Sequence, residues 1–375
     1  MDLHAEPQPS TPLLAVQHAA RELRVGGMVR FTGDAGPVDV VAAETFSGSD
    51  GAGRTETLRG SVLALTGERM RSLGVPADPD QVHLLPLVAR DLAAGRIDAL
   101  IDPTAPVGST SDLLTLAQPT KRADAQAAID LCKLAGLLPA AILMPVSQAR
   151  VHVTVTVGAI GEYRRLSAST LRPVSEARVP LADVEDVRIV SFRPADGGPE
   201  QYAILVGEPE RDAEPLARLH SECFTGDLLG SLRCDCGDQL RGAIRRMAHE
   251  GSGVLLYLAQ EGRGIGLTNK LRAYMLQDDG LDTVDANHHL GFGGDERDYW
   301  GAAAMLRQLG IGRVRLLTNN PSKITQLRQY GIEVAGRVPH IFAANEHNRR
   351  YLRTKAERSG HLLPVDGETP RLTAV

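Results

Sequence analysis

The sequence predicts a two-domain protein of mixed α and β structure (α+β, or mixed α/β). Its 375 residues are enough for two domains. In the second half, short apolar segments typical of strands alternate with segments of helical periodicity. Between the two predicted domains, residues 164–186 lack a clear hydrophobic period and contain two prolines, so we place the boundary there. We therefore expect a disordered tail at 1–12 and domains at 13–180 and 187–375.

The first half contains four segments with a clear pattern. LLAVQHAARELRVGG (residues 13–27) predicts a helix that the glycine pair ends, and ADAQAAIDLCKLAGL (123–137) predicts a second helix. AAILMPV (140–146) and VHVTVTV (151–157) are apolar or β-branched and predict buried strands. SGSDGAGR (47–54) predicts a flexible loop, because glycine and serine dominate it.

The second half alternates predicted strands and helices. The strands are YAILVG (202–207), GVLLYLA (253–259) and RVRLLT (313–318). The helices are LRGAIRRMAHEG (240–251), TNKLRAYMLQD (268–278), GAAAMLRQLG (301–310) and SKITQLRQYG (322–331). This order favours a sheet with functional loops at the ends of its strands.

Composition and charge exclude several classes of function. The chain has a net charge of −5, and residues 187–375 hold 24 basic and 24 acidic residues, so a nucleic-acid binder is not expected. No run of 18 apolar residues suggests a transmembrane helix, and the N-terminus lacks the pattern of a signal peptide. Together with the reduced thiols inferred below, this predicts a cytoplasmic protein with no membrane partner.

Three of the four cysteines are clustered. Cys223, Cys234 and Cys236 have the spacing C-x10-C-x-C, whereas the fourth, Cys132, lies far away. Three thiolates would leave one corner of a zinc tetrahedron for water, which is the arrangement of a catalytic zinc. Two alternatives remain: a closed structural site completed by His220, and a thiol cluster without metal. The adjacent His288 and His289 are not expected to be ligands, because their side chains diverge.

Two loops are typical of anion binding. QEGRGIGL (260–267) is glycine-rich and precedes a helix, and its Glu261 and Arg263 could bind a polar heterocycle and a phosphate. In LLTNNPSK (316–323), Asn320 suits a helix N-cap, and Lys323 in the first turn favours a bound anion. The alternatives are an ordinary tight turn and a surface lysine.

A third loop, GFGGDERDYW (291–300), places four charged residues after three glycines. Asp295, Arg297 and Asp298 could carry out acid–base or phosphoryl chemistry. The alternative is a charged helix start, because acidic residues are common in a first turn.

These motifs, in this order, resemble GTP cyclohydrolase II over about residues 187–363. The matching segments are RLHSEC, SLRCDCGDQL, QEGRGIGL, NKLRAY, LDTVDAN, GFGGDERDY, LLTNNPSK and the ending HN-YL-TKAERSGHLL. The resemblance implies that zinc, bound by the three clustered cysteines, supplies the water that opens the guanine ring at carbon 8. It also implies Mg²⁺ with the triphosphate, release of formate and pyrophosphate, and a diaminopyrimidinone product in the first step of riboflavin synthesis.

The resemblance also implies roles for individual residues. Asp295 matches the family's proton acceptor, Tyr274 its active-site tyrosine, and Arg297 its proposed nucleophile toward the α-phosphate. Arg297 could equally stabilise charge electrostatically, because a guanidinium does not lose its proton. The implied GTP contacts are Arg218, Leu219, His220, Ser221, Glu222, Gln239, Glu261, Gly262, Arg263, Thr283, Thr318 and Lys323.

The first half resembles 3,4-dihydroxy-2-butanone 4-phosphate synthase through QPTKRADAQAAIDLCKLAGLLPAAILMPV. In that family a magnesium-binding His stands where this chain has Asp124, and a Glu aligns with Gln126. The family's acidic loop has no counterpart in residues 33–49. We therefore expect a retained fold without synthase activity, serving as a dimerisation or stabilising platform in a homodimer.

The sequence leaves three other functions to consider. One is a bifunctional enzyme with an active synthase half, and another is a cyclohydrolase paralogue that serves a different pathway. Tyr274 favours the ordinary product over an early-stopping paralogue. The third, a zinc-containing nucleic-acid-binding module, is disfavoured by the charge balance and by an aromatic content of 4%.

Overall fold

The computed structural model describes residues 11–46, 60–87, 96–105, 114–146, 151–210, 213–358 and 360–363. The predicted loop at 47–54 lies outside these ranges, as do residues 1–10 of the predicted tail. The tail prediction is wrong for residues 11 and 12, because helix α1 (Thr11–Arg24) begins at Thr11.

The chain forms two compact units. The N-terminal unit contains Pro9–Tyr163 and Ile265–Glu296, and the C-terminal unit contains Arg164–Gly264 and Arg297–Val375. The sequence did not predict that Ile265–Glu296 would belong to the N-terminal unit. The predicted domain ranges, 13–180 and 187–375, follow the two family resemblances and not the compactness of the chain. They stay predictions.

The N-terminal unit is built on a seven-stranded sheet with the order β5-β4-β3-β6-β2-β1-β7. The central strands β2 (Val38–Ala42) and β6 (Ala140–Met144) are buried along their whole length, as the apolar sequence of β6 predicts. The other strands are β1 (Val29–Thr32), β3 (Val62–Thr66), β4 (Val82–Pro86), β5 (Gln118–Thr120) and β7 (Val153–Thr156). The prediction that 151–157 is a buried strand is wrong in its burial, because β7 stands at the sheet edge and buries only Val155.

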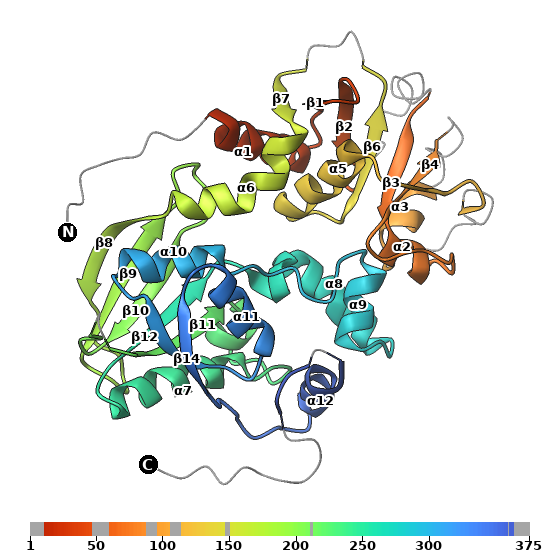
Figure 1. Cartoon of the computed structure of the whole chain (residues 1–375). Helices are drawn as coiled ribbons and strands as arrows, with labels where there is room; N and C mark the ends of the chain where they lie inside the picture. Colours follow the sequence, from red (N-terminus) through yellow and green to blue (C-terminus); the bar gives the residue numbers. More distant parts are fainter. Residues whose placement is uncertain are drawn as a thin grey trace. The chain divides into compact units, whose positions relative to one another are not determined.

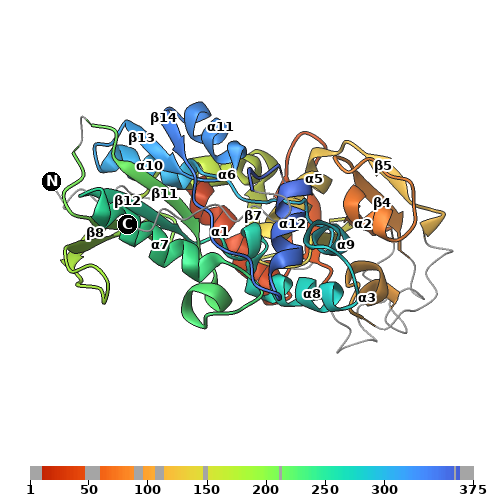
Figure 2. The same ribbon diagram turned by 90° about the horizontal axis from the view of Figure 1, so that it is seen from below.

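Among the described residues, six helices lie wholly within this unit (Figure 1). They are α1, α2 (Gly67–Ser72), α3 (Arg96–Ile101), α5 (Ala123–Leu134), α8 (Gly266–Asp278) and α9 (Thr283–His289). The predicted helices at 13–27 and 123–137 are confirmed as α1 and α5, each followed by a glycine with positive φ, Gly26 and Gly136. Both views place α9 beside α2 (Figures 1 and 2).

The C-terminal unit has its own seven-stranded sheet, with the order β14-β13-β11-β12-β10-β9-β8. Its strands are β8 (Arg172–Arg178), β9 (Val187–Arg193), β10 (Gln201–Val206), β11 (Leu216–Ser221), β12 (Gly253–Leu258), β13 (Arg313–Leu317) and β14 (Glu333–Val338). The first three pair antiparallel, and β11 pairs parallel to β12 and β13. Parallel strands end at one edge, so their following loops gather there.

Helices cover both faces of this sheet. On β12, Val254 and Leu256 join one apolar core, whereas Leu255 joins a second core with Met247 of helix α7 (Cys236–His249). The first core includes Met305 of α10 (Trp300–Gln308). Helices α11 (Pro321–Gln329) and α12 (Arg349–Arg358) come later in the chain. Burial on two faces explains why β12 reads as a continuous apolar run.

The predicted fold class, mixed α and β structure in two domains, is confirmed, and each compact unit has its own seven-stranded sheet. The stretch 164–186 contains more structure than expected, namely the end of α6 (Val157–Ser169) and β8. The sequence did not predict strand β8. It is an edge strand whose residues are half-buried or exposed, so it lacks the alternation of apolar residues that indicates a strand. No helix in the described ranges has both the length and the hydropathy to cross a membrane.

Candidate active site

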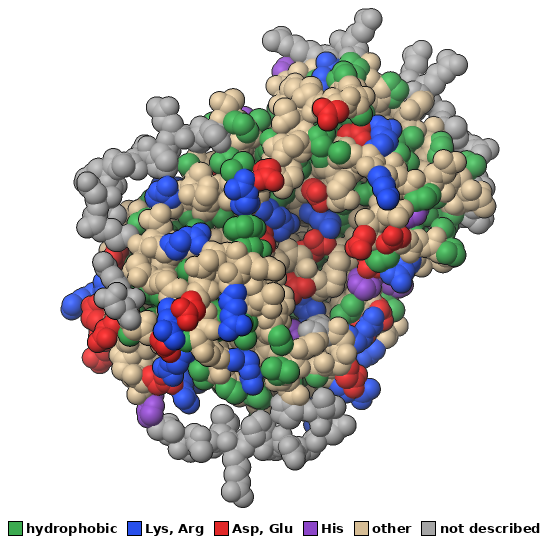
Figure 3. All heavy atoms as spheres, in the orientation of Figure 1, with side chains coloured by type: hydrophobic (Ala, Val, Ile, Leu, Met, Phe, Trp, Pro, Cys, Tyr) green, Lys and Arg blue, Asp and Glu red, His purple; other side chains and the backbone are tan. Residues whose placement is uncertain are grey.

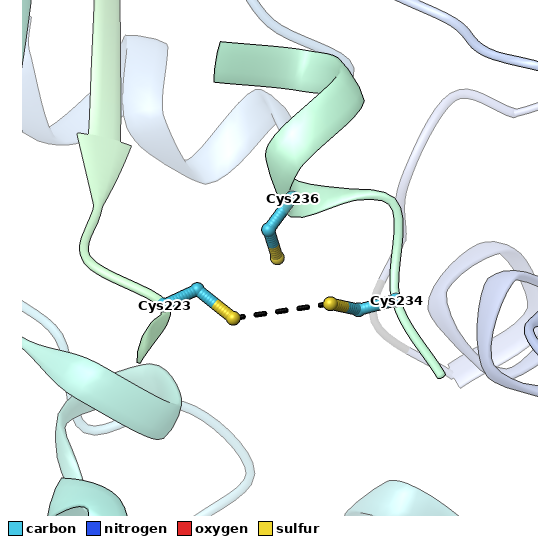
Figure 4. Close-up of side chains that lie close together, drawn as sticks. All are labelled: Cys223, Cys234 and Cys236. Carbon is cyan, nitrogen blue, oxygen red and sulfur yellow. Dashed lines mark hydrogen bonds between the residues drawn. The ribbon is translucent and has the colours of Figure 1, made fainter. Parts of the chain in front are cut away.

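The clustered cysteines meet at the start of α7. Cys223 follows β11 and precedes a π-helical turn (Phe224–Leu228), Cys234 lies in a loop, and Cys236 is the first residue of α7. The three Sγ atoms lie within 4.8 Å of one another, and those of Cys223 and Cys234 are 3.8 Å apart (Figure 4). All three sulfurs point toward a common centre, so the cluster could hold a metal ion.

A glycine allows the three sulfurs to approach. The backbone N–H of Gly226 donates to Cys223 Sγ at 3.3 Å. A Cβ at position 226 would lie 2.7 Å from Cys234 Sγ and 3.1 Å from Cys223 Sγ. Both distances are shorter than a carbon–sulfur contact allows, so only glycine fits without moving the ligands.

A buried carboxylate fixes the turn that carries Cys223. Asp227 Oδ2 accepts hydrogen bonds from the Cys223 backbone N–H and from the Tyr257 hydroxyl, both at 3.0 Å. His220 Nε2 lies 3.0 Å from the same oxygen. His220 is therefore turned toward Asp227, and the cluster found in the described residues consists of the cysteines alone. Burial lowers the pKa of His220 despite Asp227, so its ring is neutral at neutral pH.

The chemistry of the donor set fits a soft cation. Contact with Cys223 raises the pKa of Cys234 to about 11, and contacts with Cys223 and Cys234 raise the pKa of Cys236 well above its ordinary value. Three thiolates repel one another, and a cation among them removes that repulsion. Cysteine sulfur is a preferred ligand of Zn²⁺, and three such ligands leave a position open.

A strongly basic pocket adjoins the cluster. It holds about 660 Å³ of space between protein atoms, part of it open to solvent, and Cys236 lines it. Five basic side chains and one acidic side chain also line it, namely Arg218, Arg263, Arg297, Lys323, Lys355 and Asp235. Further lining residues are His220, Ser221, Gln239, Thr318, Asn319, Asn320, Tyr351, His361 and Leu363. This charge balance suits a polyanion.

Two of these cations are buried and donate to carbonyls of the sheet. The Arg218 guanidinium donates to the Leu317 carbonyl at 3.0 Å and contacts the Gln239 side chain. Burial lowers the pKa of Arg218 to about 10, which leaves it charged at neutral pH. Lys323 is only 6% exposed, and its Nζ donates to the Leu219 carbonyl at 2.6 Å. The alternative that Lys323 is a surface lysine is therefore wrong.

The glycine-rich loop carries unusual backbone geometry. Arg263 has φ 62°, the only positive φ among the non-glycine residues described, and Gly262 beside it has φ 64°. Such strain persists where surrounding structure or function requires it. Glu261 accepts the backbone N–H groups of Phe224 at 2.6 Å and of Gly262 at 2.9 Å. The carboxylate thus ties this loop to the turn after Cys223.

The helix after the second loop begins as predicted. Asn320 caps α11 by accepting the Ser322 backbone N–H at 2.9 Å, and Pro321 occupies the first turn. In the third loop, Arg297 Nη1 lies 3.5 Å from Ser221 Oγ. The alternative of a charged helix start is wrong, because α10 begins only at Trp300.

Several pocket residues were missed by sequence reasoning. Lys355 Nζ lies 3.2 Å from Asp235 Oδ1 and 4.1 Å from the centre of the Tyr351 ring, so α12 contributes two side chains to the pocket. The available signal was the C-terminal ending, in which both residues occur within a matched motif. Asp235 could have been noticed because it separates two cysteines.

The expected site residues divide between the two units. Of the expected GTP contacts, those that line the pocket are Arg218, His220, Ser221, Gln239, Arg263, Thr318 and Lys323. Leu219, Glu222, Glu261 and Gly262 lie in the same unit but are not among its lining residues. Tyr274 on α8, Thr283 at the start of α9, and Asp295 belong to the N-terminal unit. His288 and His289, on α9, are outside the metal-ligand cluster found in the described residues.

Replacing Gly226 by alanine tests the packing around the sulfurs. We expect G226A to lower metal affinity by roughly 10-fold or more, the range seen when groups that support a metal ligand are lost. Metal content per chain after dialysis against a graded chelator is the measurement. G336A is the matched control, since an added Cβ there meets nothing within 4 Å. Equal metal retention by both variants would contradict this account of the cluster.

The comparisons with known proteins agree with this geometry. The sequence profile of the GTP cyclohydrolase II family matches residues 172–339. A GTP cyclohydrolase-2 of Azospirillum brasilense is 51% identical over 370 residues, which cover 95% of this chain and 96% of that protein. A GTP cyclohydrolase-2 of Xylella fastidiosa is 39% identical over 379 residues, 97% of this chain and 91% of that protein.

A solved structure, RibBX, a two domain 3,4-dihydroxy-2-butanone 4-phosphate synthase from A. baumannii, aligns with 87% of this chain and 99% of that chain. Its identity is 17% and its TM-score is 0.31, a similarity too low to carry a conclusion about this fold. The long, high-identity relatives decide the assignment. This chain belongs to the GTP cyclohydrolase II family.

Proposed function

We propose that this chain hydrolyses GTP in a zinc-dependent reaction that opens the guanine imidazole ring. The products would be formate, pyrophosphate and 2,5-diamino-6-(5-phosphoribosylamino)pyrimidin-4-one, the first step of riboflavin synthesis. The observation that carries the proposal is the basic pocket with Cys236 in its wall. A polyanionic nucleotide in that pocket would lie next to the three-thiol cluster.

The basic residues would bind and orient the triphosphate. Arg218 and Lys323 are buried and held by backbone carbonyls, so their charges are already in place before an anion arrives. Arg263 reaches the same pocket from the strained glycine-rich loop. We further propose that Mg²⁺ accompanies the triphosphate. Together with the cations of the pocket, the metal would neutralise the negative charge of the phosphates.

The three cysteines would hold the zinc. When bound there, zinc supplies a water molecule that loses a proton near neutral pH, and so a nucleophile. The loops that carry the cysteines would be held in position by Asp227, by Gly226 and by the buried Asp235–Lys355 pair. Arrangement of such supporting groups commonly determines how well a metal site works.

Three residues would take part directly in proton and phosphoryl chemistry. Asp295 would accept a proton, and Tyr274 would contact the reacting base. Arg297 lines the pocket within 3.5 Å of Ser221 and would act on the α-phosphate, either as a nucleophile or by stabilising charge. Failure to trap a covalent guanylyl adduct by rapid quench would favour the electrostatic role, and trapping one would favour the nucleophile.

We also propose that the N-terminal unit retains a synthase-like fold without synthase activity. Asp124 forms an ion pair with Arg122 at 2.6 Å and accepts the Ala125 backbone N–H at 2.9 Å. Gln126 is exposed and donates to Asp130. Both side chains are thus engaged within the protein, and the group of potential metal ligands found among the described residues lies in the other unit.

The test of this second proposal is incubation of the protein with ribulose 5-phosphate and Mg²⁺. We expect no 3,4-dihydroxy-2-butanone 4-phosphate above a protein-free control. Turnover in that assay would instead favour the bifunctional alternative. A homodimer and a cytoplasmic location stay predictions from the sequence.

The test of the main proposal is incubation of metal-analysed protein with GTP and Mg²⁺. We expect formate and pyrophosphate in equal amounts, together with the change in purine absorbance that ring opening causes. Removal of the metal by a chelator should abolish both products, and added Zn²⁺ should restore them. Pyrophosphate without formate, or turnover in metal-free protein, would rule the proposal out.

Lys323→Met tests the role of the basic pocket. A hydrogen bond to a charged group contributes about 1.5–3 kcal/mol, so we expect the KM for GTP to rise about 10-fold or more. K323R keeps the charge and serves as the matched variant, with a smaller expected change. If K323M has the KM of the unaltered protein, Lys323 does not contact the triphosphate.

A further inference from the structure

We propose that the N-terminal unit orders part of the catalytic segment, with Lys133 as a positioning residue for the turn that carries Asp295. The proposal rests on the proposed function, in which Asp295 accepts a proton. Residues 265–296 lie inside the stretch that matches GTP cyclohydrolase II. In the structure they nevertheless form one compact unit with Pro9–Tyr163.

The apolar side chains of this segment complete the core of the N-terminal unit. Leu276 on α8, Ala286 on α9, and Leu290 and Phe292 after it are buried. They share one core cluster with residues of β3, α2 and α3, among them Leu63, Leu65, Met70, Ile97 and Leu100. The segment therefore depends on the first part of the chain for its hydrophobic burial.

Hydrogen bonds fix the backbone that follows α9. Arg69 Nη1 donates to the His289 carbonyl at 2.7 Å, and Thr66 Oγ1 donates to the Gly291 carbonyl at 2.8 Å. Gly291 has φ 86°, and a Cβ there would lie 3.0 Å from Pro139 Cγ. The turn thus begins from a backbone that is held on two sides.

Two ion pairs of Arg272, on α8, hold the same segment. Arg272 Nη2 lies 2.7 Å from Glu44 Oε1, and Arg272 Nε lies 3.3 Å from Asp102 Oδ2. Asn269 Nδ2 donates to the Gly136 carbonyl at 3.3 Å. Helix α8, which carries Tyr274, is consequently anchored by residues from three other parts of the N-terminal unit.

Lys133 contacts the turn itself. Its Nζ, on α5, lies 2.7 Å from Glu296 Oε1, and the two side chains are 16% and 14% exposed. The same carboxylate oxygen accepts the Gly293 backbone N–H at 2.7 Å. Glu296 therefore closes a turn from 293 to 296 that contains Asp295, and the ammonium of Lys133 holds that carboxylate. A pair shielded from water in this way is stronger than an exposed pair.

Loss of the ammonium should loosen the turn without touching the zinc ligands. A small displacement of a reacting group lowers catalysis steeply, so we expect Lys133→Met to lower kcat at least about 10-fold. The KM for GTP should change less, because the residues that line the basic pocket belong to the other unit. K133R, which keeps the charge, should recover most of the activity.

The matched control is Lys121→Met, the same chemical change at an exposed position of the same unit. Hydrogen exchange read by mass spectrometry supplies a readout that does not depend on activity. In the full-length K133M protein, peptides covering 288–298 should exchange faster, whereas peptides covering 236–258 should not change. Zinc content should also match that of the unaltered protein.

Each outcome separates this inference from the proposed function. If unaltered protein does not turn over GTP, the proposed function fails, while the exchange data still report whether Lys133 orders the turn. If GTP turnover is normal in K133M, or exchange at 288–298 is unchanged, the positioning role of Lys133 is wrong. If K133M also loses zinc or unfolds at a lower temperature while K133R gains no activity, the role of Lys133 is general stability, and the inference is equally overturned.

Discussion

The mutual approach of three thiol sulfurs within 4.8 Å is the constraint on which the site of the C-terminal unit depends. Thiolates this close repel one another, and a cation among them would remove that repulsion. The surrounding structure is organised to permit it. Gly226 leaves room for the sulfurs, and Asp227 holds the backbone of Cys223. The pairing of Lys355 with Asp235 compensates the buried charge that lies between two of the ligands.

The basic pocket likewise depends on charged groups that the surrounding structure holds in place. The buried Arg218 and Lys323 donate to backbone carbonyls, so their positive charges are held in place before an anion binds. Mixed charges over the face drawn in Figure 3 contrast with this local excess of positive charge. A pocket that concentrates one sign of charge on an otherwise mixed surface selects a polyanionic ligand. In the proposed function, a bound nucleotide would lie against Cys236, because that residue is part of the pocket wall.

Local patterns predicted the elements of the site but not their supports. The cysteine spacing, the Asn320 cap and the helix after each loop follow from residues close together in the chain. Gly226 and Asp227 lie between the ligands, yet nothing in the local sequence distinguishes them from ordinary loop residues. The pairing of Lys355 with Asp235 and that of Lys133 with Glu296 join positions 120 and 163 residues apart. Such contacts depend on how whole elements pack, which one sequence does not reveal. For the same reason, the membership of 265–296 in the N-terminal unit could not be foreseen.

Zinc K-edge X-ray absorption on metal-replete protein tests the central claim most directly. The account predicts one zinc per chain with three sulfur neighbours at about 2.3 Å and one lighter neighbour at about 2.0 Å. On addition of GTP the three sulfur neighbours should remain. A shell of four sulfurs, a shell in which lighter atoms outnumber sulfur, or protein that binds no stoichiometric metal would contradict a metal centre built on Cys223, Cys234 and Cys236.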